Sequence, residues 1–129
     1  MKEVNSGNVN LVKVEKIEVD IKSFNYGNKI VLENIRTSFI PGKKYGIVGD
    51  SGCGKSTLVK LFVKLYESDG VMINGKNIHQ YSLESLRNKI FLLPHQPQIF
   101  PLSIKENILI GASEEEKSRY DDVKKMSFL

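Results

Sequence analysis

The chain is poor in the features that mark secreted or membrane-spanning proteins. It has one cysteine in 129 residues, Cys53, and a single thiol cannot form an intrachain disulfide. The first five residues lack the apolar stretch of a secretory signal. No apolar run approaches the roughly 18 residues that a membrane span needs, and the longest are short pieces such as residues 90–93. The sequence therefore predicts a cytoplasmic protein, and any membrane role must come through a partner.

The chain also lacks a concentrated block of charge. Its 19 Lys and Arg residues against 15 Asp and Glu residues give a net charge of +4, but the basic residues are scattered from Lys2 to Lys125. Because nucleic-acid surfaces usually gather their basic residues on one face, no nucleic-acid partner is expected. The hydrophobic fraction of 40% and the charged fraction of 26% are those of an ordinary globular protein, and the length suits one domain.

The amino-terminal part predicts an antiparallel pair of strands. In residues 17–22 apolar and charged side chains alternate, which is the period of a half-buried strand. Turn-forming residues follow at 24–29. An extended pattern then resumes over residues 30–40, until Pro41-Gly42 ends it.

A strand, a glycine-rich loop and a helix are predicted next, in that order. Residues 44–48, which include the apolar Tyr45, Ile47 and Val48, predict a short strand that leads directly into Gly49. The helix is indicated by four apolar residues at the i, i+3, i+4, i+7 spacing of one helix face, namely Leu58, Leu61, Phe62 and Leu65.

The middle of the chain predicts short elements that turn and capping residues delimit. Residues 71–73 form a strand that the turn signal Asn74-Gly75 closes. Ser82 caps a helix that runs through Arg87. The apolar residues 90–93 predict a buried strand.

Two capping signals predict helices near the carboxyl end. Ser103 caps a short helix that runs through Ile108. Ser113 and Glu116 form a capping box for a last helix that reaches the terminus. No internal repeat or low-complexity linker interrupts the chain.

Residues 49–56 fit Gly-x-x-x-x-Gly-Lys-Ser/Thr, the Walker A phosphate-binding loop. Glycines let consecutive N–H groups point at an anion, and the helix that begins near Gly54 adds its positive end. Lys55 reaches the β- and γ-phosphates, and the Ser56 hydroxyl can ligate Mg²⁺. The residues expected to bind a nucleoside triphosphate here are Gly49, Asp50, Ser51, Gly52, Cys53, Gly54, Lys55, Ser56 and Thr57.

Strands that precede the loop are unusual for nucleotide kinases and small GTPases, and this order resembles the nucleotide-binding domain of ATP-binding cassette (ABC) transporters. The likeness covers the chain from about Glu15 to its end. Beyond the phosphate loop it is carried by Phe24-Asn25-Tyr26-Gly27, Val31-Leu32-Glu33-Asn34-Ile35, Gly70-Val71-Met72-Ile73-Asn74-Gly75, Leu86-Arg87 and Phe100-Pro101-Leu102-Ser103-Ile104-Lys105-Glu106-Asn107-Ile108.

The resemblance implies an α/β fold, a partial P-loop NTPase core with an amino-terminal antiparallel β subdomain. It also implies that Tyr26 stacks on adenine, since a ring face meets a base face at little entropic cost. The alternative is a turn tyrosine that packs on the sheet. The segment from Phe100 to Ile108 is most similar to the exporter branch, in which this part faces the coupling helices of the membrane subunit.

The sequence departs from the family at the Q-loop. Alignment with the family's Pro-Gln-x-Pro-x-x-Phe places His95 at the glutamine position, and Gln96 serves only if the loop slips by one residue. An imidazole is a poorer ligand than an amide oxygen for a hard ion such as Mg²⁺. A shared metal site of His79 and His95 is not supported, and His79 is expected to face solvent or pack on a loop.

Three further family motifs are missing from the sequence: the Leu-Ser-Gly-Gly-Gln signature, an apolar strand that ends in Asp-Glu (Walker B), and a switch histidine. No Gly-Gly pair follows Gly54, and Asp121-Asp122 do not follow an apolar strand. No residue is therefore assigned a catalytic role, although the family hydrolyses ATP. We expect residues 1–129 to be a single partial domain, with a leader at 1–13 and the domain at 14–129, truncated before the signature and Walker B.

The leading hypothesis is the ATP-binding part of an ABC transporter ATPase that in its complete form powers membrane export. Its implied cofactors are ATP and Mg²⁺. Its implied partners are a transmembrane domain and a second nucleotide-binding domain, which places it peripherally on the cytoplasmic side of a membrane. The alternative is a truncated, non-hydrolysing nucleotide-binding or interaction fragment. A small P-loop kinase needs a cluster of lid arginines, and the only arginines are Arg36, Arg87 and Arg119.

Overall fold

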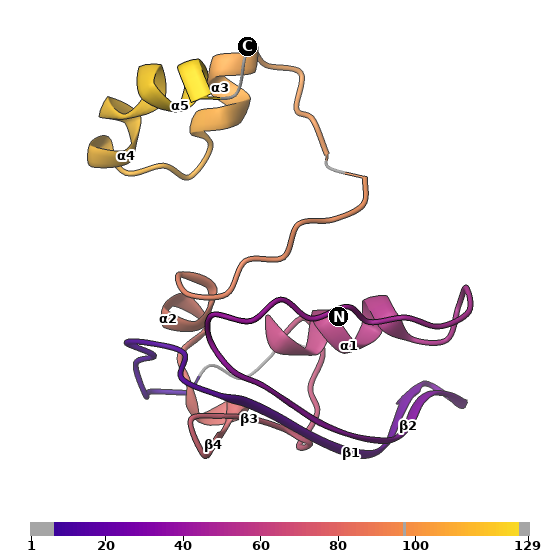
Figure 1. The fold of residues 1–129 in the computed structure, drawn as a ribbon. Helices are drawn as coiled ribbons and strands as arrows, with labels where there is room; N and C mark the ends of the chain where they lie inside the picture. Colours follow the sequence, from indigo (N-terminus) through magenta and orange to yellow (C-terminus); the bar gives the residue numbers. More distant parts are fainter. Residues whose placement is uncertain (1–6, 97, 127–129) are drawn as a thin grey trace. The chain divides into compact units, whose positions relative to one another are not determined.

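The structure is a computed structural model that describes residues 7–96 and 98–126. These residues fall into two compact units, Met1–Leu92 and Leu93–Leu129, and each is described by itself (Figure 1). None of the helices in the described part of the chain has the length and apolarity that crossing a bilayer requires.

The first unit is built on a four-stranded sheet of order β2-β1-β3-β4. Strands β1 (Ile17–Tyr26) and β2 (Lys29–Phe39) pair antiparallel along their whole length, which confirms the predicted strand pair. The two strands continue to a tight turn at Gly27-Asn28, so the turn is shorter than the predicted 24–29. Tyr26 is consequently the last residue of a paired strand.

Strand β3 (Val71–Ile73) confirms the predicted strand, and it pairs with β4 (Lys76–Asn77), which was not predicted, to form a hairpin. Its two turn residues both have positive φ, 50° at Asn74 and 75° at Gly75, as the two-residue hairpin turn requires. The Asn74 side chain also accepts hydrogen bonds from the backbone N–H groups of Glu15 and Lys16. The turn therefore anchors the start of β1 as well as closing the hairpin.

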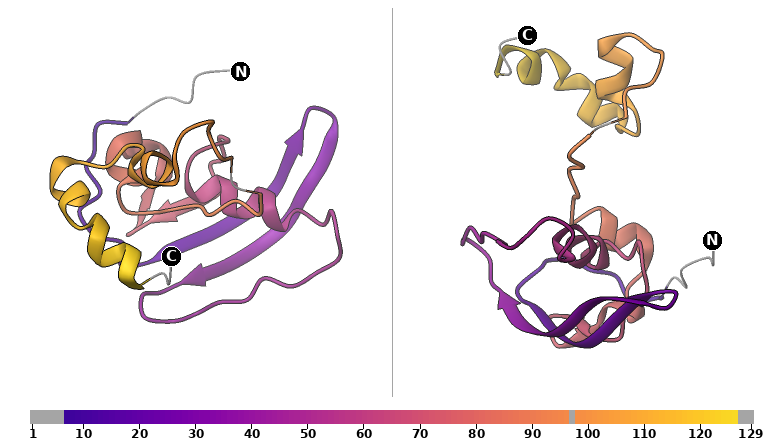
Figure 2. Two further views of the ribbon diagram at one scale, coloured as in Figure 1. Left: turned by 90° about the horizontal axis from the view of Figure 1, so that it is seen from above. Right: turned by 90° about the vertical axis from the view of Figure 1, so that its right-hand side faces the viewer.

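Helices α1 (Lys55–Phe62) and α2 (Leu83–Arg87) lie on the same side of this sheet (Figures 1 and 2). Ser82 caps α2 as predicted, because its side chain accepts the Ser85 N–H. Helices and sheet enclose one core, whose burial from water is the main source of stability. The core consists of Leu11, Val19, Ile21, Leu32, Leu58, Leu61, Val71, Ile73, Ile78, Tyr81 and Leu86.

Helix α1 ends earlier than the apolar spacing predicts. It stops at Phe62, and Leu65 lies outside it with 38% of its surface exposed. Lys64 has a φ of 51°, and this left-handed conformation ends a helix. The prediction that Leu65 lies on the apolar face of this helix was therefore wrong.

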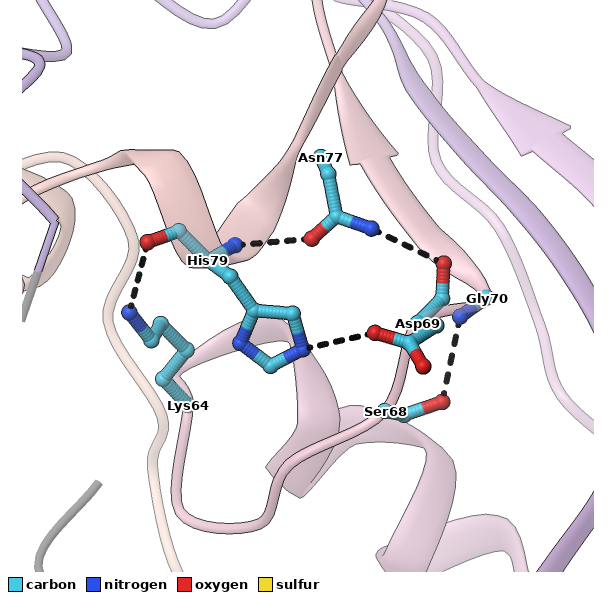
Figure 3. A network of polar contacts seen from close by, with 6 residues as sticks. All are labelled: Lys64, Ser68, Asp69, Gly70, Asn77 and His79. Atoms are coloured by element: carbon cyan, nitrogen blue, oxygen red, sulfur yellow. Dashed lines mark hydrogen bonds and ion pairs between the residues drawn. The ribbon is translucent and has the colours of Figure 1, made fainter. Parts of the chain in front are cut away.

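A polar network holds the segment that follows α1 (Figure 3). The buried Lys64 places its Nζ 3.5 Å from the carbonyl oxygen of His79 and 3.4 Å from that of Tyr81. Burial lowers the pKa of the Lys64 ammonium. The side chain of Asn77 accepts from His79 N–H and donates to the carbonyl of Asp69. These bonds fix the course of the chain between α1 and β3.

Two predicted strands were wrong. Residues 44–48 and 90–93 are not in a strand, and Val48, Phe91 and Leu93 are exposed by 92%, 85% and 89%. A strand forms only when a neighbour satisfies its N–H and C=O groups. Among the described residues no strand pairs with either segment.

The predicted leader contributes to the first unit through its described residues. The backbone N–H of Gly7 donates to the carbonyl of Tyr81, and that of Val9 donates to the carbonyl of Gln80. Leu11 is buried in the core with 3% of its surface exposed. The first six residues lie outside the described part, and the division at residue 13 stays a prediction.

The described residues of the second unit form three short helices: α3 (Ile104–Leu109), α4 (Glu114–Ser118) and α5 (Tyr120–Met126). Ser103 caps α3, and Ser113 with Glu116 forms the capping box of α4, both as predicted. Ser103 and Glu106 also form a capping box, which was not predicted. The last predicted helix is divided in two, because the N–H of Arg119 bonds to the carbonyl three residues back rather than four.

The capping boxes predict a dependence of helicity on pH. Hydrogen bonds from Ser103 lower the pKa of Glu106, and those from Ser113 lower the pKa of Glu116. A lowered pKa means stabilisation that is complete above the ordinary value of 4.5 and is lost as the pH falls through the lowered one. We expect the far-UV circular dichroism of the helices to weaken on acidification below pH 4.5. The double variant Glu106→Gln, Glu116→Gln should lack this component, and identical titrations of both proteins would contradict the assignment.

Candidate functional site

The glycines of the glycine-rich loop adopt backbone conformations that are unfavourable for residues with a side chain. Gly54 has a φ of 95° and is the N-cap of α1. A Cβ on Gly54 would lie 2.6 Å from the carbonyl oxygen of Val31 and 2.6 Å from Cδ2 of Leu32. The loop is therefore pressed against β2 at this glycine, and the sheet fixes where α1 begins.

The amino terminus of α1 adjoins the loop. The first intrahelical bond runs from Leu58 N–H to the carbonyl of Gly54, at 2.9 Å. In the described residues no side chain caps this end, so the first N–H groups of the helix have no intrahelical partner. Together with the helix dipole they favour a negative charge at this position.

Lys55 closes over the loop. Its ammonium donates to the carbonyl oxygens of Gly49 at 2.8 Å and Asp50 at 2.6 Å, and lies 3.7 Å from Sγ of Cys53. Carbonyl oxygens are weaker partners for an ammonium than the oxygens of a phosphate. The Lys55 ammonium is therefore held at the loop by carbonyl contacts that a bound anion would replace.

The remaining loop residues differ in how far they are exposed to solvent. Asp50, Ser51, Gly52, Cys53 and Ser56 are exposed, whereas Thr57 is 7% exposed and turned into the fold. The Ser56 hydroxyl is thus accessible to a cation bound with a phosphate. Within residues 7–96 and 98–126, no three His, Cys, Asp or Glu side chains are grouped to hold a metal ion by themselves.

Tyr26 belongs to a cluster of three aromatic rings. Its ring centroid lies 5.3 Å from that of Phe24 and 4.9 Å from that of Tyr66, both in edge-to-face geometry. Burial, followed by the neighbouring Tyr66, raises the pKa of Tyr26, and Thr57 opposes the rise. Tyr26 keeps 38% of its surface exposed, enough for a planar ligand to stack against it.

Tyr66 was missed by the sequence analysis. It follows the end of α1, beyond the apolar residues that mark the helix face. The only available signal was an aromatic residue directly after that pattern, which does not reveal a contact with Tyr26.

Three residues that the sequence analysis discussed remain: His95, Gln96 and His79. His95 and Gln96 are exposed in a bend of the second unit, so their assignment to the Q-loop stays a prediction. His79 packs on a loop, as one expectation had it, with its Nε2 3.5 Å from Oδ1 of Asp69 (Figure 3).

Comparison with known proteins decides the family. The family described as ABC transporter matches residues 32–128. The chain belongs to the ABC transporter family. ATP is the ligand that this family implies for the loop.

Relatives of known sequence agree with this family. The chain is 44% identical over 95 residues to the lactococcin transport/processing ATP-binding protein LcnC-like of Lactococcus lactis. The matched segment covers 71% of this chain and 13% of the relative. It is 37% identical over 113 residues to an ABC transporter ATP-binding/permease protein of Haemophilus influenzae, covering 86% of this chain and 20% of the relative. The chain thus spans 13% and 20% of the length of these two relatives.

A solved structure of an Atm1-family ABC exporter with ATP bound has the same fold. It matches 94% of this chain and 22% of its own, with a TM-score of 0.80 and 27% sequence identity. The match confirms the predicted fold class, a partial P-loop NTPase core with an antiparallel β subdomain. This ABC chain therefore presents the nucleotide-binding architecture of its family, and the comparisons do not favour the alternative of an isolated interaction fragment.

Proposed function

We propose that the chain is the ATP-binding part of a transporter ATPase that powers export across a membrane in its complete form. The observation that carries the proposal is the loop at the uncapped amino terminus of α1, with the Lys55 ammonium held over it. Family membership and relatives named as ATP-binding/permease proteins support it.

In the proposed complex the phosphates of ATP bind at the amino end of α1. The free N–H groups of the first turn donate to phosphate oxygens, and Lys55 exchanges the carbonyls of Gly49 and Asp50 for stronger charged partners. The flanking positions Ser51, Gly52, Cys53 and Thr57 line or support this cradle. Tyr26 stacks on the adenine ring, because its exposed surface offers an aromatic face.

Ser56 is the residue proposed to hold Mg²⁺. The ion prefers oxygen ligands and keeps several waters, so one hydroxyl together with phosphate oxygens suits it without a cage of carboxylates. The exposed Ser56 side chain in the first turn of α1 fits this role. Bound Mg²⁺ supplies charge neutralisation on the phosphates. The Q-loop role stays proposed for His95, or for Gln96 if the loop slips by one residue.

The second unit is proposed to face a transmembrane partner. Its apolar side chains surround a hollow of about 430 Å³, and several are half exposed or more although they are large. Exposed apolar surface of this kind marks interaction sites. Such docking implies a position on the cytoplasmic side of a membrane, and a second nucleotide-binding domain would complete a dimer. The lining includes Ile99, Phe100, Leu102, Ile104, Ile108 and Ile110.

The proposal predicts that Mg-ATP protects Cys53 from maleimide. Cys53 is exposed, lies next to the Lys55 ammonium and is the only cysteine, so labelling reports on the loop alone. At ten times the dissociation constant of ATP, labelling should slow about tenfold, because only the ligand-free fraction reacts. Reaction rates are followed by mass spectrometry, with Mg²⁺ alone as the control. Equal rates with and without ATP would reject nucleotide binding at this loop.

A further inference from the structure

Tyr66, which follows the end of α1, packs against the aromatic residues at the end of β1. Its ring meets that of Tyr26 at an interplanar angle of 75° and a centroid distance of 4.9 Å. It also lies 6.1 Å from the ring of Phe24. Edge-to-face pairs at these distances are attractive beyond simple burial, so the three rings hold one another's orientation.

The side chain of Tyr26 is also affected by α1. The pKa of Tyr26 is raised by burial and then by Tyr66, and Thr57 in the first turn of α1 opposes the rise. Thr57 is 7% exposed and therefore fixed by packing. The ring at the end of β1 is thus close to the helix whose amino end forms the phosphate cradle.

The backbone that carries Tyr66 is itself anchored. The N–H of Leu65 donates to the carbonyl of Lys60 at 3.1 Å. The buried Lys64 reaches the carbonyl of His79 (Figure 3) and also that of Tyr81. A ring on such a segment has a defined position rather than a free one. Tyr66 can therefore restrain Tyr26 before any ligand arrives.

We propose that Tyr66 is a positioning residue that holds the Tyr26 ring in the orientation in which it stacks on the base of ATP. This inference rests on the proposed function of the loop and of Tyr26. A ring that is already oriented loses less rotamer freedom when the ligand binds, so more of the stacking energy appears as affinity. Tyr66 should consequently matter for ligands that carry a base and not for the phosphates alone.

The test compares ATP with inorganic tripolyphosphate, which offers the phosphates without a base. Binding of each to the 129-residue chain is measured by isothermal titration calorimetry. Tyr66→Leu should weaken ATP binding about three- to tenfold, a part of what one base stack contributes, and leave tripolyphosphate binding unchanged. Tyr66→Phe keeps the ring and should restore most of the preference for ATP.

Phe62→Leu is the matched control. Phe62 is an aromatic residue of α1 that packs on Phe39, at a centroid distance of 5.5 Å, and is not in the Tyr26 cluster. It should change stability without changing the ratio of the two affinities. If Tyr66→Leu does not fold, Tyr66→Met, which keeps a long apolar side chain, replaces it.

The outcomes separate the two proposals. An unchanged ratio of ATP to tripolyphosphate affinity in the Tyr66 variants would overturn the positioning role while leaving the phosphate loop intact. An equal loss for both ligands would assign Tyr66 to the general stability of the fold, which also overturns it. Failure of the unaltered chain to bind either ligand would reject the proposed function and with it this inference.

Discussion

Lys55→Ala is expected to weaken ATP binding at least about tenfold. A hydrogen bond to a charged group contributes about 1.5–3 kcal/mol, and each 1.4 kcal/mol corresponds to about a tenfold change in affinity. The Lys55 ammonium is already held beside the loop by two carbonyl oxygens, so little rearrangement is needed before it reaches a phosphate. The measurement is a titration with a fluorescent ATP analogue.

Lys60→Ala provides the control for this substitution. Lys60 lies in the last turn of the same helix, so its loss changes the net charge equally but removes no contact with the loop. Its variant should bind the analogue as the unaltered chain does. Equal binding by the Lys55 and Lys60 variants would show that the analogue binds elsewhere.

Gly54→Ala is expected to destabilise the first unit by about 2–5 kcal/mol, from backbone strain and overpacking together. The new methyl group would need to occupy a left-handed backbone at φ 95° and would meet the carbonyl of Val31 at 2.6 Å. Either α1 or β2 must shift to relieve the contact. Both elements border the phosphate cradle, so ATP binding should fall with stability.

The variant Gly52→Ala separates backbone strain from overpacking as causes of the lost stability. Gly52 also has a positive φ, 82°, but a Cβ there would meet nothing within 4 Å. It should cost only the strain of the left-handed conformation, about 1–2 kcal/mol. Urea denaturation followed by circular dichroism measures both variants. Equal losses at the two glycines would mean that the approach of β2 to the loop has no energetic consequence.

The local elements of the fold could be predicted because the interactions that define them span only a few residues. The hairpin turn at Asn74-Gly75 depends on two residues that tolerate positive φ, and both have it. The boxes at Ser103 and Ser113 each close within three residues. The alternation in residues 17–22 predicted β1 because one face of that strand lies in the core.

The site was predictable to a different degree in its different parts. The phosphate loop is one continuous segment, and its sequence motif specifies its backbone conformation. The glycines and Lys55 could therefore be identified together. The stacking role of Tyr26 was implied by a family resemblance, whereas its position as the last residue of β1 was not predicted. The contact of Tyr26 with Tyr66 joins residues 40 positions apart and has no spacing rule, so only the folded chain revealed it.

The sequence alone determined the strand pair, the phosphate loop, the start of α1 and the helix caps, because short-range hydrogen bonds and glycine conformations specify them. Tertiary structure decided whether apolar segments become strands. Residues 44–48 and 90–93 have suitable composition, yet neither is a strand, since a strand needs a neighbouring backbone and composition supplies none. It also decided where α1 ends, because the buried Lys64 bonds to carbonyls that only the fold brings within its reach.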